Sequence, residues 1–410
     1  MVTPSPPITA TESSSVRSVD GQSRAANLLL ITGILLVAVN LRPALASVGP
    51  LVEDIRQTTG LSNAWLGLLT TLPLIAFGVI STLTPLFTRR FGIGGTLLGA
   101  MALLAFGTAM RSIPWLPALY FGTLLLGIAI AFGNVLLPSL TKRNFASRSG
   151  FITSLYSAGM ALGASLAAGV SIPLANDLNL GWRGTLGVWA IPAMIAFVVW
   201  LPQASRLKKS EPGRSFQAAM KHLGRSKLAW QVALFMGLQS LTFYVVLAWL
   251  PAILISRGCD ASYAGWMLSL SQAMGIVGSL IVPTLAGRTA DQRVFVLLMA
   301  LIESIGLAGL WLDPQGWIVL WVSMIGFILG GSFGLALLFI VLRSKDTQSA
   351  TELSGMAQSI GYLVAATGPM IFGGLFDFSG TWFYSFVLLF VVGVLKLAMG
   401  LGAGAARTLD

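Results

Sequence analysis

Charged side chains, cysteine and histidine are all scarce in this sequence. Only 10% of its 410 residues are charged, whereas a soluble globular domain usually carries about 25%. Hydrophobic residues make up 55% of the chain, and the mean hydropathy is +0.83. This composition excludes an ordinary soluble domain. It indicates an all-α polytopic membrane protein, because a helix satisfies its own backbone hydrogen bonds in lipid.

The single cysteine and the single histidine exclude several kinds of site. Cys259 has no second thiol with which to form a disulfide or a cysteine-based metal site. His222 lies in a polar stretch, where we expect it to be solvated. The residue spacings match no metal site, no nucleophile paired with a base and no loop that cradles phosphate. We therefore predict no enzymatic activity, no bound metal and no cofactor.

Basic residues outnumber acidic residues by 25 to 14, but no aromatic-rich basic surface accompanies them, so we predict no nucleic-acid partner. In membrane proteins, an excess of Lys and Arg in the loops on one side sets the orientation. The loops on the side of the N-terminus hold Arg89, Arg90, Lys142, Arg143, Arg148, Arg288, Arg293, Arg343 and Lys345. The opposite loops hold Arg56, Arg111, Arg183 and Arg257. This asymmetry predicts that both termini are cytoplasmic.

Twelve apolar segments approach the roughly 20 residues that a membrane-spanning helix needs. They lie near 27–50, 63–87, 94–112, 117–140, 149–175, 184–203, 229–255, 262–286, 294–312, 317–342, 351–375 and 379–404. They predict a disordered cytoplasmic tail (1–25), an N-terminal six-helix half (26–203), a cytoplasmic linker (204–227), a C-terminal six-helix half (228–405) and a C-terminal tail (406–410). The first segment would serve as an uncleaved signal, because the tail lacks the apolar run of a signal peptide.

The two halves share an internal repeat. Four pairs of identical residues are separated by the same 201 positions, namely Pro50 and Pro251, Arg56 and Arg257, Trp65 and Trp266, and Gly133 and Gly334. The pairs fall in the first, second and fourth segments of each half. In transporters built from repeated halves, the substrate binds between the halves near the middle of the bilayer, and the halves rock about it.

A polar interruption occurs in the first apolar segment, within "LLVAVNLRPALASVGPLV", residues 35–52. Arg42 lies about 22 Å along the helix from Asn27 at 1.5 Å per residue. An unpaired Arg at such depth costs about 3 kcal/mol on insertion scales, so we expect it to face a wet cavity or a partner. The alternatives are that it reaches toward the headgroups or braces a neighbouring helix. Pro43 cannot donate to the carbonyl of Val39 and so loosens the helix, while Asn40 adds an amide.

The planar charge of Arg42 suits a small anion, or a heterocycle that carries a nitro or carboxylate group. Two parallel hydrogen bonds from its fork would fix the orientation of such a ligand. The position 201 residues further on is Phe243, so only one half carries the charge. The second half offers uncharged polar groups nearby, at Gln239, Ser240, Thr242 and Tyr244. We therefore predict a cleft that is cationic on one side and aromatic and polar on the other.

Other polar residues within the segments have two interpretations. Asn134 could bind substrate or could hold two helices together, since a polar bond between transmembrane helices is worth about 0.6 kcal/mol. Ser354, Gln358 and Tyr362 recur at a helical spacing of four and form a stripe that faces either the cavity or a helix–helix seam. The candidates for substrate binding are Arg42, Asn40, Asn134, Gln239, Tyr244, Gln358 and Tyr362.

Ionisable groups that could carry protons are few within the segments. Glu303 is the only carboxylate well inside a segment, and we expect it to be protonated or paired between helices. Lys396 is expected to extend toward the cytoplasmic headgroups. This scarcity makes protein-borne proton coupling a weak hypothesis. An anion that enters a cell against 100 mV climbs about 2.3 kcal/mol, which leaves export, exchange or a substrate that carries its own proton.

Five stretches resemble the cyanate permease and 2-nitroimidazole exporter family of the major facilitator superfamily. They are "NLRPALASVGPLV", "LGLLTTLPLIAFG", "GNVLLPSLTKRNF", "AWLPAILISRG" and "LSGMAQSIGYLVAATGP". The resemblance covers nearly the whole chain after the tail. It implies small-solute transport, with Arg42 and Asn40 as ligand candidates and with the first and fourth helices of each half lining the cavity. In "PLFTRRFG", Pro85 and Arg89 replace a Gly and an Asp of the superfamily's usual loop, which puts in question any gating salt bridge built on that Asp.

The function that we expect is secondary active or facilitative transport, by alternating access, of a small anionic or nitro-aromatic solute that is cyanate-like or 2-nitroimidazole-like. The alternative is a receptor or sensor that has the same fold and moves no solute. We expect a monomer in the bacterial cytoplasmic (inner) membrane. Its partners would be the small-molecule substrate and the lipid bilayer.

Overall fold

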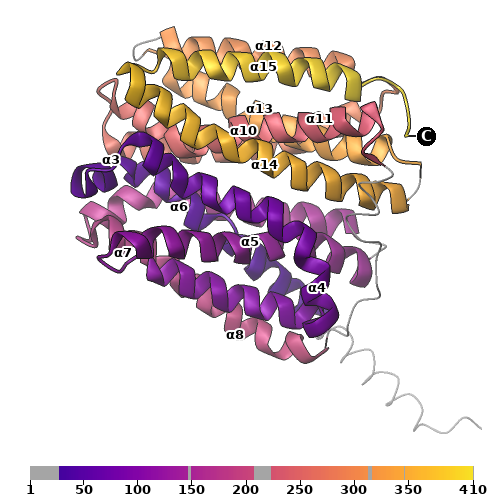
Figure 1. Cartoon of the computed structure of the whole chain (residues 1–410), viewed down its shortest axis with the longest axis horizontal. Coiled ribbons are helices and arrows are strands. Elements are labelled where there is room, and N and C mark those ends of the chain that lie inside the picture. Colours follow the sequence, from indigo (N-terminus) through magenta and orange to yellow (C-terminus); the bar gives the residue numbers. More distant parts are fainter. Residues whose placement is uncertain (1–26, 146–148, 207–222, 313–315, 346, 410) are drawn as a thin grey trace, which may run out of the picture.

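The computed structural model of the chain describes residues 27–145, 149–206, 223–312, 316–345 and 347–409, and these form helices without any strand (Figure 1). A first helix covers residues 27–40. The labelled helices are α2 (Pro43–Ala46), α3 (Val48–Thr59), α4 (Asn63–Met110), α5 (Leu116–Asn144), α6 (Ser149–Asn176), α7 (Gly181–Val188), α8 (Ala190–Arg206), α10 (Lys227–Ile255), α11 (Ala261–Ala286), α12 (Arg293–Leu312), α13 (Ile318–Leu342), α14 (Thr347–Ser379) and α15 (Phe383–Ala403). The predicted tail and most of the predicted linker, with His222, lie outside the described residues.

Twelve segments of the described chain are long and apolar enough to cross a membrane. They confirm the predicted all-α fold with twelve transmembrane helices. Two of them, Asn63–Thr84 and Leu86–Met110, belong to the single element α4, whose backbone leaves the helical conformation at Gly92 with a φ of 74°. Glycine adopts this positive φ without strain because it has no Cβ atom.

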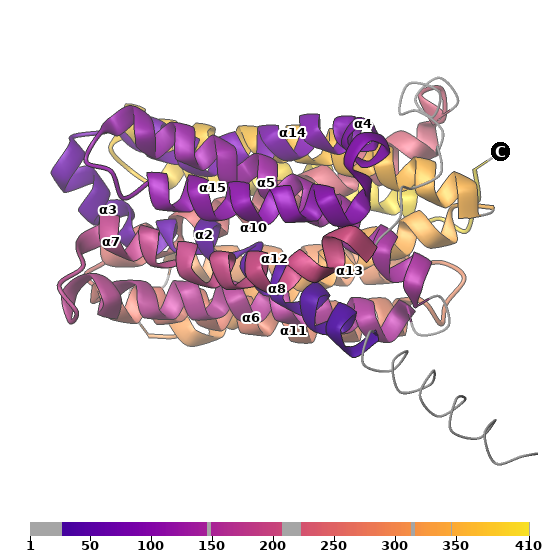
Figure 2. The same cartoon turned by 90° about the horizontal axis from the view of Figure 1, so that it is seen from below.

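The helices form two groups that follow the order of the chain. Helices α2 to α8 lie on one side of the molecule and helices α10 to α15 on the other, as Figure 1 shows. In Figure 2, which is seen from below, the two groups lie one behind the other. Across the boundary, α14 packs along α4, α11 packs along α6, and α10 packs against α3. The interface between the groups therefore contains helices from both ends of the sequence.

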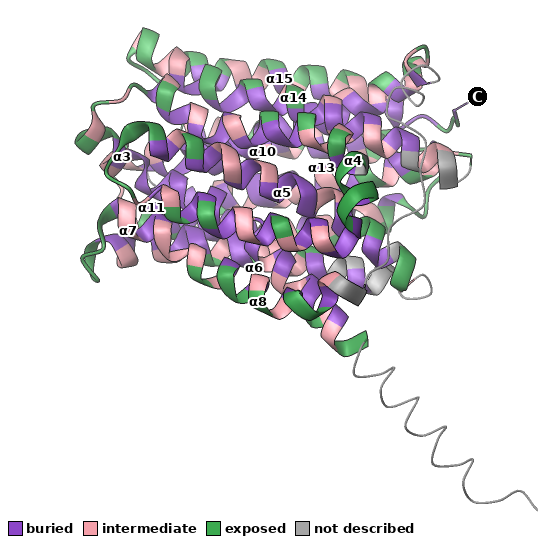
Figure 3. Ribbon diagram, turned by 60° about the horizontal axis from the view of Figure 1, so that its bottom comes forward, coloured by how far each residue is buried: buried purple, intermediate pink, exposed green. Residues whose placement is uncertain are grey.

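The degree of burial differs between the central helix α10 and the outer helices α12 and α15. Of the residues in an 18-residue apolar stretch of each span, 83% are buried in α10, against 33% in α12 and α15. Figure 3 shows the same contrast, with α10 mostly buried and α15 largely exposed along its outer face. Exposed apolar side chains on the outer helices include Ile191, Leu301 and Val394. Such a surface suits contact with lipid chains, which are as apolar as these residues.

We call the end of the bundle at which Asn27 lies the near end, and the opposite end the far end. The C-terminus also lies at the near end (Figure 1). The loops that follow α3, α10 and α12 lie at the far end, because the spans that lead into these loops start at the near end.

The two halves are joined at the far end by hydrogen bonds. The carboxylate of Asp377, near the end of α14, accepts bonds from the backbone N–H groups of Asn63 and Ala64 at 3.0 and 2.8 Å. It also accepts a bond from the Asn63 amide at 2.8 Å. Asp377 therefore caps the N-terminus of α4, where negative charge is favourable. Ser165 on α6 and Ser269 on α11 share a further bond of 2.8 Å between their hydroxyl groups.

The expectation that Lys396 extends toward the headgroups is wrong. Its side chain on α15 is buried and lies 2.5 Å from the carboxylate of Glu303 on α12, which is buried as well. The ammonium stays inside the protein because the oppositely charged carboxylate offsets its loss of hydration. Of the two expectations for Glu303, the structure shows pairing between helices.

Candidate substrate-binding site

The first membrane-spanning segment is interrupted at Arg42. The helix over residues 27–40 ends there, and the N–H of Leu41 donates to the carbonyl of Ala38, three residues back, at 3.1 Å. Arg42 has a φ of −115°, after which the N–H groups of Leu45 and Ala46 both donate to its carbonyl. The four-residue helix α2 then leads into α3. The loosening that Pro43 predicts is therefore present as a break between two helices.

Glycines from two neighbouring helices allow close packing around the break. A Cβ atom built on Gly163 of α6 would collide with the carbonyl oxygen of Val39, the carbonyl that Pro43 leaves without its usual donor. One built on Gly133 of α5 would lie 2.6 Å from the side chain of Leu41. Because both positions lack a side chain, α5 and α6 approach the break closely and fix its shape.

Arg42 extends from the break toward the second half. Its Nη1 donates a hydrogen bond to the hydroxyl of Tyr244 at 3.2 Å. Its guanidinium carbon lies 5.2 Å from the centre of the Phe243 ring and 5.8 Å from that of the Tyr244 ring, within the roughly 6 Å range of cation–π attraction. Arg42 is half-buried while Leu41 and Pro43 are buried, and it forms no ion pair with the described residues.

Two further aromatic residues extend this contact. The ring of Phe77 on α4 lies 5.2 Å from that of Tyr362 on α14 and 6.5 Å from that of Tyr244, measured between centres. We call Phe77, Phe243, Tyr244 and Tyr362 the aromatic group. It combines α4 of the first half with α10 and α14 of the second.

The chemistry of this arrangement suits a particular class of ligand. A guanidinium has five N–H donors, and the bond to Tyr244 uses Nη1. The phenol is a neutral partner, so the positive charge of Arg42 is not cancelled by this contact. A ligand with a negative or strongly polar planar group could bind the remaining donors of Arg42 and stack its flat face on a ring of the aromatic group.

The structure brings together only some of the candidate residues. Arg42 meets Tyr244 as described, and Tyr362 joins the aromatic group through the ring of Phe77. The amide of Asn40 donates instead to the carbonyl of Leu36 at 2.8 Å, within its own helix. The amide of Gln239 donates along α10, to the carbonyl of Met236 and the hydroxyl of Ser240, and that of Gln358 donates to Ser354 on α14. Asn134 is half-buried on α5, one residue beyond Gly133.

Phe77 and Phe243 are not among the candidates that the sequence offers. The repeat does point to Phe243, because it is the counterpart of Arg42, but a phenylalanine in an apolar segment has no polar signature. Phe77 lies in "LPLIAFG", where the sequence offers no signal to separate it from ordinary packing residues. Its role depends on α4 and α14 lying side by side, which is a property of the fold.

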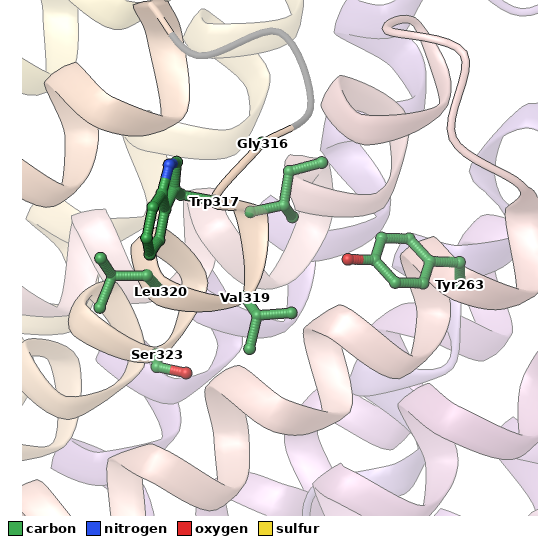
Figure 4. Close-up of a pocket in the computed structure, with 7 residues that line it drawn as sticks. Tyr263, Gly316, Trp317, Val319, Leu320 and Ser323 are labelled. Atoms are coloured by element: carbon green, nitrogen blue, oxygen red, sulfur yellow. The ribbon is translucent and has the colours of Figure 1, made fainter.

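A separate hollow opens on the surface of the second half at the far end. Tyr263 at the start of α11 and Gly316, Trp317, Val319, Leu320 and Ser323 at the start of α13 line it, as Figure 4 shows. Neither Arg42 nor any member of the aromatic group lines this hollow. It lies apart from the contact between the halves and is not part of the site around Arg42.

The family model of the Major Facilitator Superfamily matches residues 32–369 of this chain. The chain is 43% identical over 379 residues to an uncharacterized transporter, YycB, of Bacillus subtilis (strain 168), covering 92% of this chain and 94% of that protein. It is 39% identical over 387 residues to the 2-nitroimidazole transporter of Escherichia coli (strain K12), covering 94% and 97%. It is 31% identical over 371 residues to the cyanate transport protein CynX of the same strain, covering 89% and 95%.

Solved structures agree on the fold. The crystal structure of a D-xylose-proton symporter superposes with a TM-score of 0.76 at 15% identity, covering 93% of this chain and 99% of that one. Taken with the sequence relatives, this likeness defines a multi-pass membrane transport protein rather than an enzyme. The chain belongs to the major facilitator superfamily, and its resemblance to the cyanate and 2-nitroimidazole transporters is confirmed.

Proposed function

We propose that the protein carries a small planar anion or nitro-aromatic solute across the membrane by alternating access. The solute would bind Arg42 and stack against the aromatic group. The observation that carries this proposal is the position of Arg42, which lies between the two halves with a neutral hydrogen-bond partner and two ring faces around its charge and, among the described residues, no ion pair.

The names of two relatives support this class of solute. One is a 2-nitroimidazole transporter and the other a cyanate transport protein. A nitro group and a cyanate ion both offer electronegative atoms to a guanidinium, although only the nitroimidazole has a ring that stacks. The shared requirement is therefore for the charge of Arg42, whereas the aromatic group would discriminate between ring-shaped and linear solutes.

We also propose that the near end faces the cytoplasm of a bacterial cell, with the protein a monomer in the inner membrane. The basic residues of the near-end loops support this orientation. Separation of Asp377 from Asn63 and Ala64 would then be part of opening the site to the outside, because these bonds join the halves at the far end. The predicted halves, 26–203 and 228–405, would be the two bodies that rock.

Binding by purified protein tests the role of Arg42. Thermal-shift titrations with 2-nitroimidazole and with sodium cyanate should stabilise the wild-type protein. Arg42→Gln should abolish the shift because it removes the charge, and Arg42→Lys should weaken binding because an ammonium lacks the planar fork. Arg288→Gln is the matched control, since Arg288 is an exposed basic residue after α11. Equal binding by the wild type and Arg42→Gln would refute the proposal.

Counterflow in proteoliposomes separates transport from the alternative of a receptor. Vesicles loaded with unlabelled 2-nitroimidazole should accumulate the labelled compound transiently if the protein moves it between compartments. A receptor would bind the label at a fixed stoichiometry and show no transient excess. The transporter relatives support the first outcome.

A further inference from the structure

Arg111 is a fully buried charged residue that reaches the break in the first span. It follows the last residue of α4, and its exposed fraction is 0%. Its Nη1 donates to the carbonyl oxygen of Ala44 at 2.7 Å. Ala44 belongs to α2, only two residues beyond Arg42. A guanidinium from the far end of the third span is thus bonded to the short helix that carries the proposed substrate anchor.

This bond is a poor way to gain stability. The Nε and Nη2 atoms of Arg111 are buried and have no hydrogen-bond partner among the described residues. Burying a charged group with unmet donors is unfavourable, and an apolar residue of similar size often replaces such a group at no loss of stability. The benefit of Arg111 therefore has to lie in what its single bond holds in place.

The surroundings hold Arg111 itself in position. A Cβ atom on Gly122 of α5 would lie 3.1 Å from Cγ of Arg111, so this glycine leaves the space that the stem of the side chain occupies. The next residue, Ser112, donates from its hydroxyl to the carbonyl of Arg183 at 3.0 Å. The turn that carries Arg111 is thereby tied to the start of α7.

The orientation of α2 and the direction of Arg42 are linked. The N–H groups of Leu45 and Ala46 donate to the carbonyl of Arg42 at 3.1 and 3.0 Å, so the peptide group of Arg42 moves with α2. The bond from Arg42 to Tyr244 is 3.2 Å long, at the long end of the range for such bonds. A small tilt of α2 is therefore enough to break it.

We infer that Arg111 is a positioning residue that, through the carbonyl of Ala44, sets the direction in which Arg42 meets the substrate. This inference rests on the proposed function of Arg42. Arg111 does not touch the solute. It fixes α2, which follows the break, while Gly133 and Gly163 pack against Leu41 and Val39, which precede it.

Equilibrium binding of 2-nitroimidazole provides the first test. Arg111→Gln should raise the Kd on the order of tenfold, since misplacement of a binding group by about 1 Å is costly. Arg111→Lys should stay near the wild-type value, because an ammonium can supply the one hydrogen bond that Ala44 accepts. In the Arg42→Lys background, Arg111→Gln should raise the Kd little further, because the planar guanidinium that Arg111 positions is already absent.

Arg257→Gln is the matched control. Arg257 also lies at the far end and donates to backbone carbonyls, those of Leu310 and Trp311 at the end of α12. Arg257→Gln should leave the Kd for 2-nitroimidazole unchanged. Equal changes in Kd for the two variants, or an unchanged Kd in Arg111→Gln, would overturn the inference.

Hydrogen exchange provides a test that needs no substrate. Arg111→Gln should speed exchange of the backbone amide hydrogens of Leu41, Arg42, Ala44, Leu45 and Ala46, whereas Arg257→Gln should not. If 2-nitroimidazole fails to bind the wild-type protein, the proposed function fails while this measurement still decides whether Arg111 holds α2. Unchanged exchange in Arg111→Gln would show that it does not.

Discussion

The guanidinium of Arg42 lies 5.2 Å from the ring centre of Phe243, and the two residues occupy equivalent positions of the internal repeat, 201 residues apart. Equivalent residues of two halves related by a pseudo-two-fold axis come into contact only close to that axis. Arg42 and Phe243 therefore lie close to the axis that relates the two halves. The duplicated positions now carry a cation in one half and an aromatic ring in the other.

The Phe243 ring should contribute to substrate binding through its contact with Arg42. A cation–π contact is worth about 0.5–2 kcal/mol, so Phe243→Leu should weaken the binding of cyanate by roughly 2- to 30-fold. Phe243→Tyr keeps the ring face and should stay close to the wild type. Isothermal titration of the three proteins measures this difference. Equal affinities for the Leu and Tyr variants would contradict a role for the ring face.

The buried pair of Glu303 and Lys396 should stabilise the outer layer of the second half without serving transport. Glu303→Gln leaves the ammonium of Lys396 buried without its counter-charge, which costs about 3–5 kcal/mol. Lys396→Met should be similarly harmful. The double variant Glu303→Leu with Lys396→Met removes both charges and should recover most of the thermal stability. Single variants that melt like the wild type would show that the pair is unimportant.

Much of the fold could be predicted from the sequence because the bilayer restricts it so strongly. Twelve apolar segments of sufficient length have few arrangements, and the 201-residue repeat relates the two halves. The position of Lys396 could not be predicted in this way. Its pairing with Glu303 depends on α12 and α15 lying together, whereas the residues are 93 positions apart in the sequence.

For the candidate site too, some features could be predicted from the sequence and others could not. Arg42, Tyr244 and Tyr362 could be predicted because a charge or a hydroxyl is conspicuous in an apolar segment. The amides of Gln239 and Gln358 are equally conspicuous, but both bond within their own helices. Whether an amide in a helix faces a ligand or bonds locally depends on its rotamer, and the residue pattern does not specify that choice.

Cys259 should report the orientation of the protein. It lies in the far-end loop between α10 and α11 and is partly exposed. A membrane-impermeant maleimide should label it in whole cells if the near end is cytoplasmic, with Cys259→Ser as the unlabelled control. Labelling only after the cells are permeabilised would mean that the orientation is the reverse.

The rate of that labelling should depend on pH. Burial raises the pKa of the Cys259 thiol above its ordinary value, against a smaller opposing effect of the Arg257 charge. The thiolate is the reacting form, so its fraction increases with pH until the raised pKa is passed. Between pH 7 and pH 8, both below that pKa, the labelling rate should rise about tenfold. A rate that is flat over this interval would contradict the raised pKa.

Gly163 should be intolerant of a side chain, because α6 touches the break there. Gly163→Ala would force its methyl group against the carbonyl of Val39, and overpacking of this kind costs about 1–3 kcal/mol. It should lower the melting temperature and weaken the binding of 2-nitroimidazole. Gly99→Ala is the matched control, since a Cβ atom at that helical position meets no atom within 4 Å. Similar melting temperatures for the two variants would contradict the close approach.

The cap that Asp377 places on α4 should keep the far end closed. Asp377→Ala removes the acceptors of three hydrogen bonds between the halves. Hydrogen bonds to a charged group are worth about 1.5–3 kcal/mol each when buried, and exposure of Asp377 to solvent reduces this value. We therefore expect a shift of roughly tenfold or less toward the state that is open at the far end.

A cysteine placed at Thr71 measures that shift. Thr71 is buried on α4 and donates to the carbonyl of Ala366 on α14 at 2.8 Å, so it lies between the halves. In a Cys259→Ser background, Thr71→Cys should react several times faster with an impermeant maleimide when Asp377 is replaced by Ala. Asp291→Ala is the control, because Asp291 bonds to Arg293 within its own half at the near end. Equal rates with and without Asp377 would mean that its carboxylate does not hold the halves together.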